Sequence, residues 1–252
     1  MPASEQLRNA NSNLRFVIPD EFEGKPLNFQ TILPVRNATG RSKRTVRGKV
    51  ADTEHECTLG AESFNEFKAL RIIVALGHYD SCKVQPCELK FKFNGLPCRY
   101  YPDFLIIRGW QLMLVEVKRD DKANRPEVQE FFKRVKTLLS EHGLEFVLWK
   151  ESEIISEPRY TNVGLMLRYR RTQVSDVERE RVRRAFNSAT SMSLTTLSKV
   201  SAVSVQGICH LVLEGMLYID WWETLGLESL ISTVPIGRQI FPSARTRIGV
   251  IV

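Results

Sequence analysis

The chain has 252 residues, of which 43% are hydrophobic, and this excludes disorder throughout because such a sequence can fill the core of one large or two modest domains. Its formal charge of +7 favours an acidic partner, most often nucleic acid, although a basic protein without such a partner can have the same composition. The sequence has neither an apolar run of about eighteen residues nor a signal-peptide apolar block near its start, so we expect a cytoplasmic protein.

The cysteines form no recognisable motif. None of the five belongs to a CxxC pair, so the sequence predicts neither a disulfide framework nor a zinc knuckle. A zinc set of His78, Cys82, Cys87 and Cys98 is the alternative, but the last two fall in strand-like runs without paired ligand turns. We therefore expect reduced, mostly buried thiols.

Residues 1–57 show little periodicity and are predicted to form a basic arm. Within residues 36–50 the cations stand among small residues, and flexible segments of this kind bind phosphate backbones by releasing counterions. A solvated linker is an equally good interpretation of this stretch. The residues that we expect to contact DNA here are Arg41, Lys43, Arg44, Arg47 and Lys49.

A helix is predicted from Ser63 to Gly77. Its apolar residues recur at spacings of three and four, and Gly77 suits the position just after a helix end. Ser63 and Glu66 fit a capping box, in which the Glu side chain reaches back to the amide of the cap residue. That role explains Glu66 without any catalytic function.

Two strands are predicted next, at residues 84–93 and 96–101. They are joined at residues 94–95 by Asn-Gly, the dipeptide that type I′ hairpin turns prefer. We expect this meander to lead the chain into a sheet at Asp103. Pro102 has no amide donor, which indicates a bulge or an edge at that point.

The following hairpin carries three ionisable residues beside apolar runs. The runs FLII and LMLV flank a two-residue turn that begins with Gly109, as a type II′ turn requires. Counting outward from this turn places Asp103 opposite Glu116, with Cβ atoms about 4.5–5.5 Å apart. Lys118, two residues beyond Glu116, points to the same face.

Asp103, Glu116 and Lys118 together favour metal-dependent hydrolysis of a phosphodiester. Opposed carboxylates repel each other, and their burial costs several kcal/mol without compensation. Mg²⁺ or Mn²⁺ removes both objections, since these ions bind through one or two carboxylates and keep positions open for water and phosphate. Lys118 can help to deprotonate or orient the attacking water and offset charge in the transition state. A salt bridge between Lys118 and one acid at the strand end is the alternative.

After Lys118 the sequence predicts a charged loop, a helix and a further strand. Pro126 suits the first helical position, and apolar residues from Phe131 to Leu139 lie on one side of the helix. Residues 144–149 are short and apolar, as an interior parallel strand would be. The order from Ser63 onward is therefore helix, three-strand meander, helix, strand.

Residues 158–236 are predicted to form a second, smaller domain with the element order of a winged helix-turn-helix. Its predicted elements are a basic helix within VERERVRRAF, helices at 193–200 and 204–214, and a strand at 216–221. We expect DNA contacts from Arg168, Arg170 and Arg171. The last helix offers only Gln206 and His210 as polar readers, so a protein partner is an equally open interpretation. Residues 237–252 are basic and then apolar, which predicts a tail that docks on a partner.

The motif positions resemble a known nuclease superfamily. Pro102-Asp103 followed by Glu116-Val117-Lys118 is similar to the PD-(D/E)XK core of many restriction endonucleases and recombination nucleases. The resemblance implies a restriction endonuclease-like α/β fold over residues 58–157, with an αβββαβ core and a mixed central sheet. It also implies a further acid on the preceding helix, for which Glu66 is the best candidate and Glu62 the reserve.

A narrower resemblance covers roughly residues 60 to 225. Glu66, Gln85-Pro86, Tyr101-Pro102-Asp103 and Glu116-Val117-Lys118, followed by a winged-helix-like unit, are similar to TnsA, the endonuclease subunit of heteromeric cut-and-paste transposases. The implied catalytic set is Glu66, Asp103, Glu116 and Lys118, with Gln85 lining the site. The implied ligands of two Mg²⁺ ions are Glu66, Asp103, Glu116 and the Val117 carbonyl.

The same resemblance implies partners and a cellular setting. The expected partners are double-stranded DNA at transposon ends, a DDE transposase (TnsB-like) that cuts and joins the 3′ ends, and an AAA+ ATPase regulator (TnsC-like). The chain itself would cleave the 5′, non-transferred strand in a prokaryotic, nucleoid-associated complex. A stand-alone restriction-type or repair nuclease and a non-catalytic DNA-binding scaffold are the alternatives.

Overall fold

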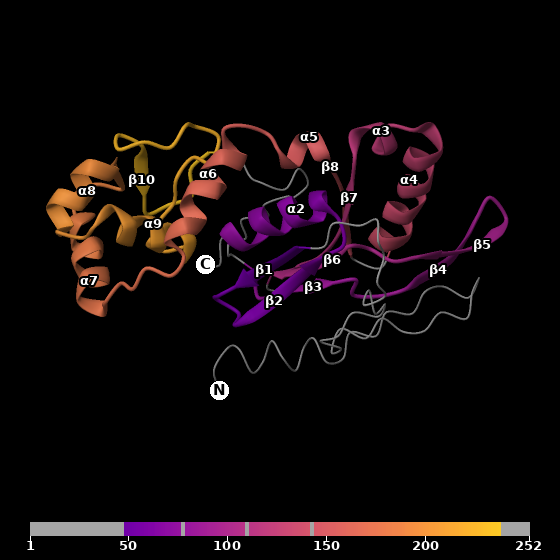
Figure 1. Ribbon diagram of the computed structural model, residues 1–252, viewed down its shortest axis with the longest axis horizontal. Helices are drawn as coiled ribbons and strands as arrows, with labels where there is room; N and C mark the ends of the chain where they lie inside the picture. The colour runs from indigo at the N-terminus through magenta and orange to yellow at the C-terminus, as the bar shows by residue number, and fades with distance from the viewer. Residues whose placement is uncertain (1–47, 77–78, 109–110, 142–143, 238–252) are drawn as a thin grey trace. The chain divides into compact units, whose positions relative to one another are not determined.

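The computed structural model describes residues 48–76, 79–108, 111–141 and 144–237. The chain divides after Ile155 into two compact units, each of which is described by itself. The first unit contains β1 (Gly48–Asp52), β2 (Cys57–Ala61), α2 (Phe64–Ala75), β3 (Ser81–Val84), β4 (Leu89–Phe93), β5 (Leu96–Tyr100), β6 (Phe104–Arg108), β7 (Gln111–Lys118), α3 (Asp120–Ala123), α4 (Pro126–Glu141), β8 (Glu145–Lys150) and α5 (Glu151–Ile154) (Figure 1).

A four-stranded mixed sheet forms the centre of the first unit, with the strand order β3-β6-β7-β8. β6 pairs antiparallel with both β3 and β7, whereas β8 pairs parallel with β7. The parallel pair requires a crossover, which α4 provides. The predicted mixed α/β class with a mixed sheet is thus confirmed.

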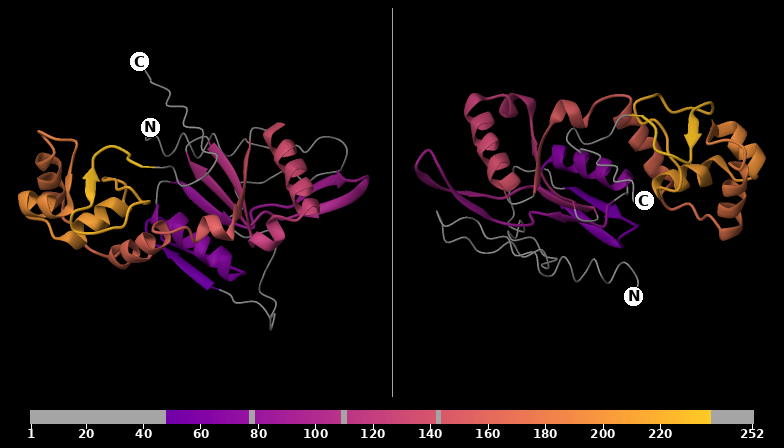
Figure 2. Two further views of the ribbon diagram at one scale, coloured as in Figure 1. Left: turned by 90° about the horizontal axis from the view of Figure 1, so that it is seen from above. Right: turned by 180° about the vertical axis from the view of Figure 1, so that it is seen from behind.

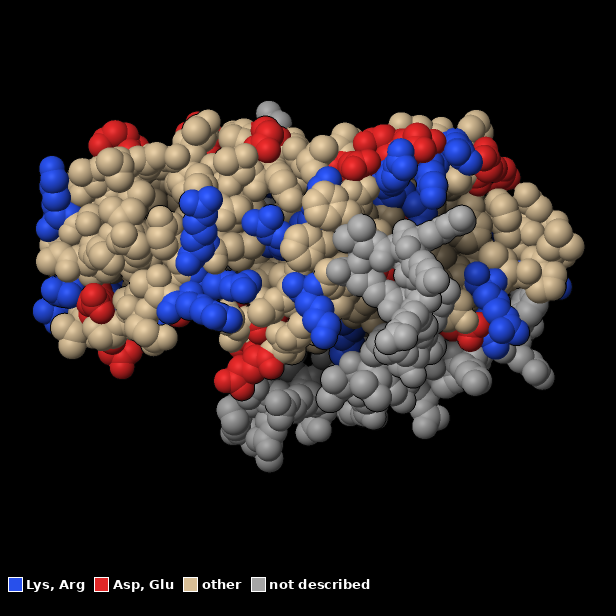
Figure 3. Space-filling view, viewed as in Figure 1, with Lys and Arg blue, Asp and Glu red and all other residues tan. Residues whose placement is uncertain are grey.

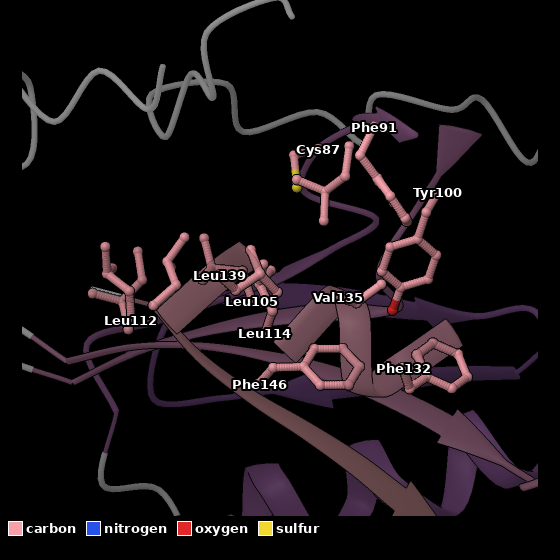
Figure 4. Packing of buried hydrophobic residues seen from close by; sticks show 13 residues of the cluster. Cys87, Phe91, Tyr100, Leu105, Leu112, Leu114, Phe132, Val135, Leu139 and Phe146 are labelled. Atoms are coloured by element: carbon pink, nitrogen blue, oxygen red, sulfur yellow. The ribbon is translucent and has the colours of Figure 1, made fainter. Parts of the chain in front are cut away.

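The main hydrophobic core lies between this sheet and α4. Leu105 and Leu114 alternate with residues that point away, so they face the same side as Phe132, Val135 and Leu139 of α4 (Figure 4). The α4 helix begins at Pro126, as predicted. Proline suits this position because a backbone N–H in the first turn has no partner within the helix, and proline has no such N–H. Helix α2 lies against β7 on the other face of the sheet (Figure 2).

The β4–β5 hairpin forms a two-stranded sheet of its own and projects beyond the central sheet in Figure 1. Asn94 and Gly95 have φ values of 51° and 76°, which confirms the expected type I′ turn. The prediction of one continuous strand over residues 84–93 was wrong. The chain leaves β3 at Gln85, whose φ of 45° is incompatible with an extended strand, and Pro86 follows.

Residues 48–57, which we assigned to a basic arm, form β1 and the start of β2 instead. The two strands pair antiparallel, from Gly48 with Ala61 to Asp52 with Cys57. Val50 and Leu59 are buried on one face of this pair. The sequence does not reveal this face, because the strands are short and most of their other residues are small or polar. Arg41, Lys43, Arg44 and Arg47 lie outside the described residues.

The second unit is mainly helical. Its described elements are α6 (Arg159–Met166), η1 (Leu167–Tyr169), α7 (Asp176–Ala185), β9 (Ser191–Ser193), α8 (Leu194–Ser201), α9 (Val205–Leu213) and β10 (Leu230–Ser232). β9 and β10 pair antiparallel, and the predicted strand at 216–221 is reduced to a single bridge between Tyr218 and Ser232. Of the predicted tail, residues 238–252 lie outside the described residues.

Helices α8 and α9 meet at a bend of 109°. Ser193 and Ser204 cap their first turns through side-chain oxygens that accept from the amides of Thr196 and Gly207. Within the ranges described, no single helix has the length and apolarity needed to cross a membrane, and only this bent pair meets that test jointly.

Candidate active site

Asp103 and Glu116 are brought together by the register of the β6–β7 hairpin. The ladder pairs Leu105 with Leu114 and Phe104 with Val115, which confirms the predicted register. One residue further along this register, Asp103 comes opposite Glu116. Asp103 itself stands just outside β6, and its Oδ2 accepts a hydrogen bond of 2.7 Å from the amide of Val117.

The Glu116 carboxylate lies at the end of the aromatic core between the sheet and α4. Tyr100, the last residue of β5, donates from its hydroxyl to Glu116 Oε2 at 2.7 Å. The Tyr100 ring packs edge-on against Phe131 and Phe132, with ring centroids 5.6 and 5.7 Å apart. Tyr100 and Phe132 are labelled in Figure 4. These contacts orient the hydroxyl, so Tyr100 fixes one oxygen of Glu116 from within the core.

Lys118 binds the other oxygen of Glu116. Its ammonium donates to Glu116 Oε1 and lies 5.8 Å from the centroid of the Phe132 ring. Burial alone would lower the pKa of Lys118, but the charges of Glu116, Asp103 and Glu66 outweigh it and raise that pKa above its usual value. Lys118 therefore carries a positive charge at neutral pH.

The two carboxyl groups are strained electrostatically. Burial, then the charge of Glu116, then that of Glu66 hold the pKa of Asp103 well above its usual value. Burial also raises the pKa of Glu116, although Lys118 and Tyr100 act in the opposite direction. Both carboxylates thus lie where a negative charge is costly, and a nearby cation would relieve that cost.

Glu66 combines the two roles that the sequence leaves open. It is the third residue of α2, where its amide is capped by Ser63 Oγ and its carboxylate accepts from Ser63 Oγ at 2.7 Å and from the amide of Glu62 at 2.8 Å. Its charge also raises the pKa values of Asp103, Glu116 and Lys118. Between the two candidate acids, Glu66 is the one that acts on the site, whereas Glu62 contributes its amide to the cap.

Gln85 borders Asp103 through the backbone. Its amide donates to the carbonyl of Asp103 at 2.8 Å. The residue is buried, and its side-chain oxygen has no hydrogen-bond partner among the described residues. A non-glycine residue with positive φ and an unsatisfied polar atom costs stability, and such costs gather at functional sites. Gln85 thus has the properties expected of a residue that lines a site.

The donor set fits a divalent cation of the Mg²⁺ type. Asp103 and Glu116 offer hard oxygen ligands, and both carboxyl pKa values are raised in its absence. Among the described residues no three His, Cys, Asp or Glu side chains are already grouped to hold a metal ion. The carboxylate of Glu66, which we predicted as a further ligand, is engaged at the helix cap.

Tyr100 is the member of the site that we did not predict. It precedes the Pro102-Asp103 motif by two residues and alternates in β5 with the exposed Arg99. Its contact with Glu116 depends on how the β4–β5 hairpin packs on α4. The only signal in the sequence near it was a tyrosine two residues before the motif, and such a tyrosine is equally typical of a core residue.

The other predicted DNA-binding residues that the structure describes are in β1 and in the second unit. Lys49 is exposed on β1. In the second unit Arg168 lies within η1 and is exposed, Arg170 is half-buried, and Arg171 is exposed. Val117 contributes the amide that holds Asp103, and its side chain is buried. The site as described thus contains Asp103 and Glu116 together with the residues that contact or charge them. Neither the models of known protein families nor the curated protein sequences include a match to this chain.

Proposed function

We propose that this chain is a metal-dependent DNA endonuclease. The observation that carries the proposal is the convergence of Asp103, Glu116 and Lys118 at the open end of one hairpin, with both carboxyl pKa values raised. A structural ion pair needs only Lys118 and one acid. The second buried carboxylate is a cost without a purpose unless a cation binds there.

The order of elements supports a restriction endonuclease-like core. Helix α2 is followed by the antiparallel strands β3, β6 and β7, then by α4 and the parallel strand β8. This is an αβββαβ order, into which the β4–β5 hairpin is inserted between the first and second strands. Active-site acids at the start of the second strand and within the third agree with the PD-(D/E)XK pattern.

Each residue then has a defined task. Asp103, Glu116, Glu66 and the carbonyl of Val117 would hold the metal. Two Mg²⁺ or Mn²⁺ ions, when bound, would offset the carboxylate charges and the charge that develops on the scissile phosphate. Lys118 would position water and phosphate and offset charge in the transition state. Tyr100 keeps Glu116 oriented throughout.

We further propose that the enzyme is the subunit of a cut-and-paste transposase that cleaves the 5′ strand. Support comes from the resemblance to TnsA and from the second unit, where α7, β9, α8, α9, the Tyr218 bridge and β10 follow the order of a winged helix. The partners in this proposal are transposon-end DNA, a DDE transposase and an AAA+ ATPase.

The exposed side of α9 favours a protein over DNA as its partner. His210 Nε2 lies 3.0 Å from Glu214 Oε1, and Glu214 also accepts from Arg179 at 2.9 Å. Glu214 follows the last residue of α9, and its contacts with Arg179 and His210 leave neither it nor His210 free to read a base. This supports a protein partner, such as the ATPase or the transposase subunit.

The test is the nicking of supercoiled plasmid with Mg²⁺ or Mn²⁺, with and without a transposase fraction. We expect metal-dependent nicking that Lys118→Ala abolishes while DNA binding persists. Nicking that needs the transposase fraction supports the transposition subunit, and nicking by the chain alone supports a stand-alone nuclease. Unchanged nicking by Lys118→Ala, or none under any condition, would refute the proposed site.

A further inference from the structure

The β4–β5 hairpin presents a row of cations beside the candidate site. Lys90 and Lys92 alternate along β4 with apolar residues, and the register places Arg99 of β5 directly opposite Lys90. All three cations therefore lie on one face of the hairpin. In Figure 3 the part of the surface around β4 and β5 carries Lys and Arg side chains with a smaller acidic area beside them.

The opposite face of the hairpin anchors it. Phe91 and Phe93 pack on Phe131 of α4, with ring centroids 5.6 and 5.3 Å apart. A two-stranded hairpin on its own is marginally stable in water, so these aromatic contacts decide how it is oriented. The cationic face is consequently held outward in a fixed direction.

The charges on this face are only partly compensated. Lys90 and Arg99 face each other across the two strands, and like charges in this arrangement repel. Glu88 approaches them at 4.0 and 3.6 Å, and it also accepts a hydrogen bond from Tyr101. Within the described residues, Lys92 makes no ion pair. The single acid Glu88 thus pairs with two of the three cations, and the face keeps an excess of positive charge that nothing within the hairpin explains.

The hairpin leads directly into the site. β5 ends at Tyr100, whose hydroxyl holds Glu116, and the chain reaches Asp103 three residues later. Residues 90 and 92, two positions apart on a strand, are separated by about 6.6 Å. Both lysines therefore project from one face of the strand, where they can contact separate phosphates of one DNA backbone.

We infer that the face formed by Lys90, Lys92 and Arg99 binds the phosphate backbone of duplex DNA and guides it to Asp103 and Glu116. The inference rests on the proposed function, because only a phosphodiester substrate gives such a track a purpose. The side chains that point outward are flexible cations with no aromatic residue among them, so the contact reads the backbone and not the base sequence.

The test compares two double variants of the full chain. Lys92→Ala with Arg99→Ala removes two charges from the hairpin, and Lys133→Ala with Lys136→Ala removes two exposed charges from α4. Binding of a mixed-sequence duplex oligonucleotide is followed by fluorescence anisotropy over a range of salt concentrations. EDTA is present throughout, so cleavage does not interfere.

For the hairpin variant, we expect the slope of log K against log salt to fall by about 1.8 and the affinity at about 0.1 M salt to fall about 60-fold. The α4 variant should retain most of the wild-type slope. An unchanged slope in the hairpin variant, equal losses in both variants, or an absence of duplex binding by the wild-type chain would overturn the inference.

Plasmid nicking by the wild-type chain in Mg²⁺, with and without a transposase fraction, separates this inference from the proposed function. If the wild type nicks DNA and the hairpin variant binds normally, the hairpin assignment fails and the nuclease stands. If the hairpin variant loses affinity but the wild type never nicks, the nuclease assignment fails and the DNA-binding face stands.

Discussion

The hydroxyl of Tyr100 donates to Glu116 Oε2 at 2.7 Å, and this bond joins the β4–β5 hairpin to strand β7. Tyr100→Phe keeps the ring packing against Phe131 and Phe132 but removes the donor. Because the bond is buried and its acceptor is charged, we expect the free energy of unfolding to fall by about 1.5–3 kcal/mol at neutral pH. Urea denaturation measures this directly.

The pH dependence of that loss is a further check on Tyr100. A protonated Glu116 accepts a weaker bond, so the difference between Tyr100→Phe and the wild type should shrink as the pH falls through the raised pKa of Glu116. Nicking should also decline, since Glu116 loses one of its two orienting contacts. A variant that is as stable as the wild type at neutral pH would show that the bond does not form in solution.

Asp103→Asn should stabilise the protein while it abolishes nicking. The pKa of Asp103 is raised in the folded state, so its ionised form penalises folding at a pH above that of the unfolded carboxyl. The penalty reaches its full size above the folded-state pKa of Asp103 and is absent below both its folded-state and its unfolded-state pKa. Asparagine carries no charge and keeps an oxygen that can accept from the amide of Val117. We therefore expect a higher melting temperature for the variant at neutral pH and in EDTA.

Asp121→Asn is the matched control for Asp103→Asn, because Asp121 is exposed and, in the part of the chain that the structure describes, its ion pair is with the exposed Arg119. Its melting temperature should change little at any pH. The advantage of Asp103→Asn over the wild type should vanish in acid, and added Mg²⁺ should stabilise the wild type but not the variant. A variant that melts below the wild type at neutral pH would contradict the electrostatic account.

Glu66→Gln separates the cap of α2 from the chemistry. Glutamine also closes a capping box, so the melting temperature should stay near that of the wild type. The negative charge near Asp103 is lost, and we expect nicking to fall about 10- to 100-fold, as for other groups that support a bound metal.

Ser63→Ala gives the reverse pattern and serves as the control for Glu66. It removes the oxygen that caps the amide of Glu66 at a cost of about 1 kcal/mol. It also removes one donor to the Glu66 carboxylate, but the charge of that carboxylate and its bond from the amide of Glu62 remain. Nicking should survive in this variant at temperatures well below its melting point. If Glu66→Gln nicks at the wild-type rate, then Glu66 acts only as a capping residue.

The local features of the site could be predicted because they depend on counting along a hairpin. Once a two-residue turn is assumed, the pairing of Leu105 with Leu114 and the side of Lys118 follow from the alternation of side chains. Ser63 and Pro126 mark helix starts for equally local reasons, namely a side-chain acceptor and a missing donor.

Features that depend on distant packing could not be predicted. The contact of Tyr100 with Glu116 requires the hairpin to pack on Phe131, and nothing in the sequence near either residue encodes that placement. The interruption at Gln85 was missed because a glutamine between apolar residues fits a strand pattern, and only its positive φ ends the strand. Residues 48–52 form a strand because Ala61 and Leu59 pair with them, which their own polar sequence does not indicate.

Replacement of Gln85 tests whether its strained backbone and unsatisfied oxygen serve the site. Gln85→Gly removes both costs, since glycine tolerates positive φ and has no side chain to bury. We expect a free energy of unfolding equal to that of the wild type or up to about 1 kcal/mol higher, together with a clear loss of nicking.

Ala202, with a φ of 52° in the second unit, provides the control. Ala202→Gly should gain similar stability without any loss of nicking, because relief of backbone strain there is remote from Asp103 in the chain. A Gln85→Gly enzyme that is stabilised and fully active would mean that Gln85 is a tolerated defect of the fold and has no part in the site.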